Sequence, residues 1–211
     1  MATKPTVFSR EIVGGAALDL VRELGWQALS ARTVASRLGS SVGPIYSAFT
    51  SMEGLQSFVL DEATNILDAC IARAGSGKRF LDMGIGLAIF ARDEPLLYRA
   101  LLENGGSTGR LEGYKQELLA RFSTDGSWSF VDQKYRARLF ERMWLFSLGL
   151  ASALVHGYAT DTSDEELAAL LDSQGSIVIY GEIAGLGDVD GPACKKAWSA
   201  LMKRKGKHEQ D

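Results

Sequence analysis

The sequence predicts an all-α protein in which a small N-terminal unit of three short helices precedes a longer helical body. Apolar residues recur at helical spacing along most of the chain, and few runs alternate apolar and polar residues as strands do. Residues that start and end helices separate these segments. Only 4 of the 211 residues are proline, so long helices meet few breaks.

The first predicted helix lies within residues 10–24. Its apolar residues share one face, at spacings of three and four: Val13, Ala16, Ala17, Leu20, Val21 and Leu24. Gly25 follows directly, and glycine is the residue that most often ends a helix.

Ser30 is predicted to cap a second helix over residues 31–38, which Gly39 ends. Leu29 and Val34 occupy the two positions of a hydrophobic staple around that cap. Two short helices joined by a turn that contains glycine are typical of a helix-turn-helix.

Ser41 is predicted to cap the third helix. Pro44 would be the third residue of that helix, where proline is tolerated because the backbone N–H has no partner in the helix. Ile45 and Phe49 mark its inner face. Ala17, Leu20, Val34 and Leu38 complete the expected core of the three helices.

Ser51 is predicted to cap a fourth helix over residues 52–74, and a glycine-rich break at 75–77 follows. Further helices are expected at 79–92, 95–103, 111–123, 131–158 and 163–183. Ser163 and Glu166 form a capping-box pattern at the start of the last one. Residues 176–180, SIVIY, are also compatible with a short strand.

Residues 16–55, AALDLVRELGWQALSARTVASRLGSSVGPIYSAFTSMEGL, resemble the head of the tetracycline-repressor (TetR) family without a gap. The residues that match the family pattern are Ala16, Ala17, Gly25, Ser30, Val34, Ala35, Leu38, Gly39, Gly43, Tyr46, Phe49 and Leu55. The resemblance implies a DNA-binding domain over residues 1–55 and a helical ligand-binding and dimerisation domain over 56–195. The basic composition of the last residues favours a flexible tail over 196–211.

The resemblance also implies which residues contact DNA: Ser30, Arg32, Ser41, Val42, Gly43, Pro44, Tyr46 and Ser47. Arg32 would reach a base or a phosphate, and Tyr46 a phosphate. Ser41 to Pro44 begin the recognition helix, Ser47 faces the groove, and Ser30 presents its hydroxyl or the helix N-terminus to phosphate.

Two residue choices depart from the family pattern. Met52 stands where the family has lysine, and the recognition helix lacks the Lys, Arg, Asn and Gln side chains that read bases in bidentate fashion. Recognition of the DNA sequence would then depend on Arg32, serine hydroxyls, contacts with thymine methyl groups and DNA shape. Two alternatives stay open: Tyr46 is a core aromatic, and Arg37 is a solvated charge rather than a phosphate ligand.

Charge is distributed unevenly along the chain. Residues 1–50 contain five basic and three acidic residues, a balance of +2, so the rest carries −5 of the total of −3. A mildly basic head on an acidic body fits attraction to phosphate. The terminal basic residues are either a solvated tail or an additional DNA-binding arm: Lys203, Arg204, Lys205 and Lys207.

The body is predicted to form a homodimer through Met143–Tyr158 and Ser163–Ile183. Both segments are apolar nearly all round, and such helices must be covered on all sides. The resemblance further implies a cavity for a small apolar or aromatic effector, lined by aromatic and methionine residues that are otherwise ordinary core: Met83, Phe90, Tyr98, Phe122, Trp128, Phe140 and Trp144.

These features predict a cytoplasmic regulator, released from double-stranded operator DNA by its effector, with no cofactor, metal, membrane partner or enzymatic activity. Two distant cysteines and the absence of an apolar leader favour a reduced compartment. A hydrolase is disfavoured because both G-x-S-x-G motifs, at 39–43 and 105–109, follow predicted helices rather than strands. The alternative is a ligand-binding helical dimer whose head binds DNA weakly or not at all.

Overall fold

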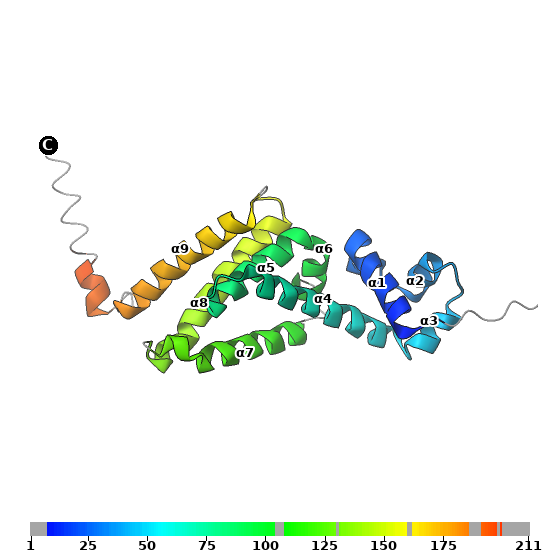
Figure 1. The fold of residues 1–211 in the computed structure, drawn as a ribbon, viewed down its shortest axis with the longest axis horizontal. Coiled ribbons are helices and arrows are strands. Elements are labelled where there is room, and N and C mark those ends of the chain that lie inside the picture. The colour runs from blue at the N-terminus through cyan, green and yellow to red at the C-terminus, as the bar shows by residue number, and fades with distance from the viewer. Residues whose placement is uncertain are drawn as a thin grey trace, which may run out of the picture.

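The computed structural model describes residues 8–103, 108–129, 131–159, 162–185, 191–197 and 199. This part of the chain is helical and contains no strand, which confirms the predicted all-α class. Three short helices form a head at one end, and α4 leads from that head into an elongated body (Figure 1). None of the described helices has the length and hydropathy that crossing a membrane requires.

The head consists of α1 (Arg10–Leu24), α2 (Ala31–Arg37) and α3 (Gly43–Ala48). α1 begins where the Ser9 side chain accepts a hydrogen bond from the backbone N–H of Ile12. It ends at Gly25, whose φ of 82° suits glycine and few other residues. A 3₁₀ turn at Trp26–Ala28, which the sequence patterns did not predict, connects α1 to α2.

α4 (Met52–Ala74) has the predicted bounds. The Ser51 side chain accepts the N–H of Gly54 at its start, and Gly75 adopts the left-handed conformation with φ 56° at its end. Its buried residues belong to one apolar core that extends through both the head and the body: Leu55, Val59, Leu60, Ala63, Leu67 and Cys70.

The body contains α5 (Arg79–Asp93), α7 (Thr108–Thr124), α8 (Gln133–Val155) and α9 (Asp164–Ile183). Between α5 and α7, the predicted single helix over 95–103 is instead α6 (Pro95–Tyr98) followed by a π-helical turn at Arg99–Glu103. A 3₁₀ turn at Gly126–Trp128 precedes α8.

Two sequence expectations about the last helices need correction. α8 ends at Val155 rather than Tyr158, because the chain turns at Gly157 with φ 74°. The strand alternative for residues 176–180 is wrong, since these residues continue α9, which begins with the predicted capping box of Ser163 and Glu166. Val178 and Ile179 pack on the body from this helix, so tertiary packing overrides the β preference.

Close packing between α4 and α5 yields a prediction about stability. A Cβ atom at Gly86 of α5 would lie 2.4 Å from the Cα atom of Ile71 in α4, and backbone atoms cannot yield as side chains can. Gly86→Ala should therefore lower the free energy of unfolding by about 1–3 kcal/mol in urea titrations followed by circular dichroism.

Gly113→Ala is the matched control, because no described atom beyond its own helix backbone lies within 4 Å of a Cβ placed there. That change should be neutral or stabilise the protein by up to ~1 kcal/mol, as alanine does in an open helix position. Equal unfolding midpoints for the two variants would contradict the close-packing argument.

Candidate functional site

The two short helices α2 and α3 form the predicted helix-turn-helix. Ser30 caps α2: its hydroxyl accepts the N–H of Thr33 at 3.2 Å, and the Thr33 hydroxyl accepts the N–H of Ser30 at 3.0 Å. Gly39 lies in the turn with φ 61°, and the next N–H, from Ser40, bonds the carbonyl of Ala35 at 2.9 Å. Backbone hydrogen bonds and the positive φ of Gly39 therefore define the turn between α2 and α3.

The start of α3 differs from the prediction. Val42, not Ser41, is the N-cap residue, and no side chain caps this end of the helix. Pro44 is the second residue of the helix rather than the third. Ser41 remains exposed, so its hydroxyl is accessible to solvent instead of being used as a cap.

One face of α3 is buried and the other is open. Ile45 and Phe49 are each 1% exposed and anchor α3 to the core of the head. Tyr46 is 48% exposed, so the alternative in which it is a core aromatic is wrong. Val42 and Ser47 are exposed as well, which leaves a surface of hydroxyl and apolar groups.

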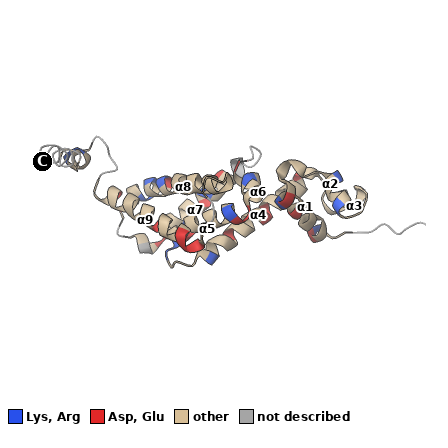
Figure 2. Ribbon diagram, turned by 90° about the horizontal axis from the view of Figure 1, so that it is seen from above, with Lys and Arg blue, Asp and Glu red and all other residues tan. Residues whose placement is uncertain are grey.

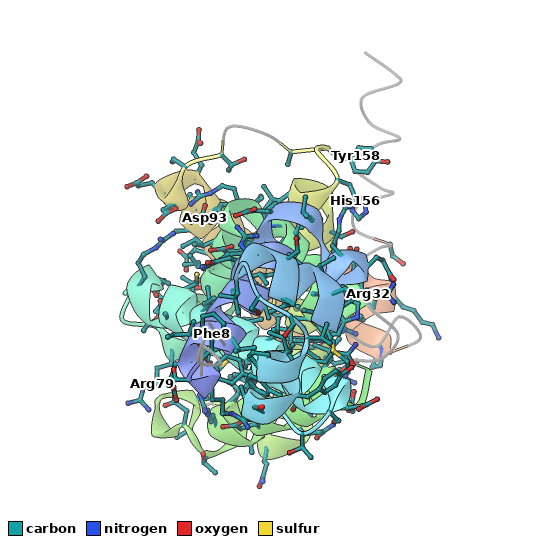
Figure 3. All side chains as sticks on the ribbon, turned by 90° about the vertical axis from the view of Figure 1, so that its right-hand side faces the viewer. Phe8, Arg32, Arg79, Asp93, His156 and Tyr158 are labelled. Carbon is teal, nitrogen blue, oxygen red and sulfur yellow. The ribbon has the colours of Figure 1, made fainter. Side chains whose placement is uncertain are left out.

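The arginines of the head differ in whether a carboxylate neutralises them. Arg22 pairs with Glu94 of the body at 2.7 Å, and Arg37 pairs with Glu23. The hydrogen bond between Glu23 and Arg37 lowers the pKa of the carboxyl and raises that of the guanidinium. Within the described residues, Arg32 is exposed and has no carboxylate partner (Figure 3).

Arg10 is a further cation of the head that sequence reasoning missed. Its guanidinium lies 4.3 Å from the centre of the Phe49 ring, where α3 ends, and 5.8 Å from that of Phe58 in α4. Stacking on a buried ring holds the guanidinium in place without neutralising it. No sequence motif signals this contact, because it joins segments far apart in the chain.

A half-open cavity of about 350 Å³ lies between α5, α8 and α9, and its volume suits a small organic ligand. Four of the seven residues predicted to bind a ligand line it: Met83, Trp128, Phe140 and Trp144. Phe122 packs behind this wall, with its ring centre 5.0 Å from that of Trp128 and 6.1 Å from that of Phe140.

Phe90 and Tyr98 lie elsewhere, which corrects their predicted place at the cavity. They are 0% and 3% exposed in the main core, with their ring centres 6.5 Å apart. The aromatic pattern could not separate core from lining residues. It also missed lining residues of other types, among them Lys78, Leu87, Met143, Ser147, Asp172 and Ile179.

The outer surface of α8 and α9 carries large apolar side chains that are exposed in the described part of the chain. In α9 the exposed ones are Leu170, Ile177, Tyr180 and Ile183, at 40–72% exposure, and α8 adds Leu145 at 59%. Figure 2 shows few charged residues along the middle of α9. At the far end, Glu182 is buried and pairs with Arg138 and Arg142 of α8, which joins the two helices.

The described residues show no geometry that supports a hydrolase or a metal site. The G-x-S-x-G segment at 39–43 lies in the turn between α2 and α3, whereas a nucleophile elbow follows a strand. The segment at 105–109 falls largely outside the described residues. No group of three or more His, Cys, Asp or Glu side chains in the described part of the chain could hold a metal ion.

The burial of Tyr98 predicts a pH effect on stability. Burial raises its pKa from 10.0 to about 12, with a smaller contribution from the negative charge of Glu103. Above pH ~10 the unfolded chain loses this proton while the folded chain keeps it, so stability should fall by up to roughly 1 kcal/mol per pH unit until pH ~12.

Urea titrations over this pH range should show a shallower fall for Tyr98→Phe than for the unmodified chain. Tyr158→Phe is the control, because Tyr158 is 87% exposed and its removal should leave the profile unchanged. Identical profiles for all three proteins would refute the role assigned to Tyr98.

No protein-family model matches the chain, and no curated protein matches its sequence. Among solved structures, it is similar to a transcriptional regulator from Rhodococcus sp. Rha1, with a TM-score of 0.61 and 20% identity over 82% of this chain and 97% of that one. It is also similar to the multidrug binding protein EbrR, solved with imidazole, with a TM-score of 0.46 and 18% identity over 78% and 88% of the two chains. The chain therefore has the all-α fold of the Rhodococcus regulator, as its resemblance to the TetR family predicts.

Proposed function

We propose that this protein is a ligand-responsive, DNA-binding transcriptional regulator that acts as a homodimer. The observation that carries the proposal is the geometry of α3. Ile45 and Phe49 bury one face, while Val42, Tyr46 and Ser47 leave the other face open at the end of the molecule. A helix held in this way after a tight turn can enter a major groove.

The head would bind DNA mainly through contacts with the sugar-phosphate backbone of the DNA. Arg32, free of carboxylates, is the strongest candidate for a phosphate or base contact, and the exposed Tyr46 hydroxyl would bind a phosphate. The remaining contacts would come from the start of α2 and from α3: Ser30, Ser41, Val42, Gly43, Pro44 and Ser47. We place the boundary of this DNA-binding domain near residue 55 and the ligand-binding and dimerisation domain at 56–195.

The cavity of the body would hold the effector. A ligand changes DNA affinity only if it prefers one conformation of the dimer over the other. The head and the body share a core through α4, and the Arg22–Glu94 ion pair joins them a second time, so a change in the body can alter the distance between the two heads. We expect the effector to release DNA, which makes the protein a repressor that acts in the cytoplasm.

The alternative is a ligand-binding dimer whose head binds DNA weakly or not at all. Two observations favour it: α3 carries no charged residue, and Arg22 and Arg37 are already paired with carboxylates. Measuring DNA affinity in a salt series separates the two functions, because phosphate contacts weaken steeply with salt.

Arg32→Gln should weaken binding to DNA from the region flanking the gene by roughly tenfold, as expected for loss of one charge-assisted contact. Fluorescence anisotropy over a salt series measures the affinity. Arg37→Gln is the matched control in the same helix, because Arg37 already pairs with Glu23, and it should change the affinity less than about threefold.

Equal losses for the two arginine variants would contradict the assignment of Arg32. Absence of binding by the unmodified protein, both to this DNA and to a selected random pool, would favour the alternative function.

Charge placed on the exposed apolar surface of α8 and α9 should separate the subunits. We expect Leu145→Glu combined with Ile177→Glu to give a monomer with unchanged helix content, because an unpaired carboxylate inside an interface is costly to bury. Analytical ultracentrifugation gives the mass, and Leu24→Glu is the control, since Leu24 is 65% exposed in the head. A dimer that survives the double change would show that the interface lies elsewhere.

A further inference from the structure

The wall of the cavity is mostly apolar and aromatic, and its uncharged polar side chains are those of Ser147 in α8 and Ser176 in α9. Ser147 of α8 lines the cavity, is 5% exposed, and has no hydrogen-bond partner among the described residues. The Ser147 side chain lines the cavity, so a ligand with a polar atom at this point would form a hydrogen bond with its hydroxyl. The lining therefore favours a mostly apolar ligand that has a polar atom near these serines.

The charged residues that line the cavity are Lys78, Arg79 and Asp172. The Lys78 Nζ atom lies 2.6 Å from the Asp172 Oδ1 atom, so these two charges neutralise each other. Arg79 has no ion pair within the described part of the chain and lies at the edge of the body (Figure 3). The three charged lining residues therefore give the cavity a net positive charge, which is the charge of Arg79.

The amino end of α5 adds to this positive charge. Lys78 is the N-cap residue and provides no side-chain hydrogen bond to the helix, and Lys78, Arg79, Phe80 and Leu81 all line the cavity. The first N–H groups of a helix lack partners within it, and the helix dipole makes this end attractive to anions.

We propose that the cavity takes a small aromatic carboxylate, with its ring system among the aromatic side chains and its carboxylate bound by Arg79 and the amino end of α5. This inference rests on the proposed role of the cavity as an effector site. A cationic ligand would lack a counter-charge, because Asp172 is already bound to Lys78. A neutral ligand would use the apolar wall and Ser147 but would gain nothing from Arg79.

Isothermal titration calorimetry on the full chain tests the proposal with three probes that share one ring system: naphthalene carboxylate, naphthalene methanol and naphthylmethylammonium. The carboxylate should bind most tightly. Arg79→Gln should weaken carboxylate binding roughly threefold to tenfold, and should change binding of the alcohol less than about twofold, because only the ion pair is removed. Higher salt should reduce the preference for the carboxylate.

Arg37→Gln is the matched control, since it removes an arginine of the head that pairs with Glu23 and does not line the cavity, and it should leave binding of all three probes unchanged. Ser147→Ala should weaken both the carboxylate and the alcohol. Equal affinity for the three probes, tighter binding of the ammonium compound, no binding of the carboxylate, or an unchanged affinity in Arg79→Gln would overturn the proposal.

DNA anisotropy measured on the same samples separates this inference from the proposed function. Intact DNA binding together with any of the contrary results above would reject the aromatic carboxylate and leave the regulator function standing. Carboxylate binding that depends on Arg79, in a protein that binds no DNA, would support the ligand class and reject the regulator function.

Discussion

The packing of α4 between the head and the body is the constraint on which the rest of the structure depends. On the head side, a Cβ atom at Gly14 of α1 would lie 2.2 Å from the Phe58 ring, and on the body side a Cβ at Gly86 of α5 would lie 2.4 Å from the backbone of Ile71. Glycine at both positions lets α1 and α5 approach α4 closely. The result is one continuous apolar core, in which a shift of α4 cannot leave either neighbour unaffected.

Sequence reasoning succeeded where local chemistry decides the structure. Ser30, Ser51 and Ser163 each cap the helix that the sequence predicted, because a hydroxyl at an N-cap needs only backbone groups three residues away. It failed where the outcome depends on distant partners. Ser41 has the same chemistry but does not cap α3, and the π-helical turn at Arg99–Glu103 interrupts a segment with ordinary helical spacing.

The candidate sites show the same division. The open face of α3 follows from the helical spacing of Ile45 and Phe49, so the exposure of Tyr46 could be predicted. The residues that line the cavity could not be predicted. Phe90 and Trp144 are both aromatic in the sequence, and they differ only in what the fold places beside them. Likewise, the pairing of Lys78 with Asp172, 94 residues apart, decides which cation remains free, and no local pattern contains that information.

The position of α5 explains how the cavity and the head can be connected. Its first residue, Arg79, lines the cavity, and Glu94, directly after its last residue, pairs with Arg22 of the head. A 15-residue helix spans roughly 22 Å, so one rigid element reaches from the proposed carboxylate site to the first helix of the head. The Arg22–Glu94 pair is partly exposed, and such pairs contribute at most about 1 kcal/mol. Coupling between sites typically amounts to about 1–3 kcal/mol. Coupling of that size between the proposed sites would therefore have to pass mainly through the packed faces of α4 and α5, where Gly86 lets the two backbones approach closely.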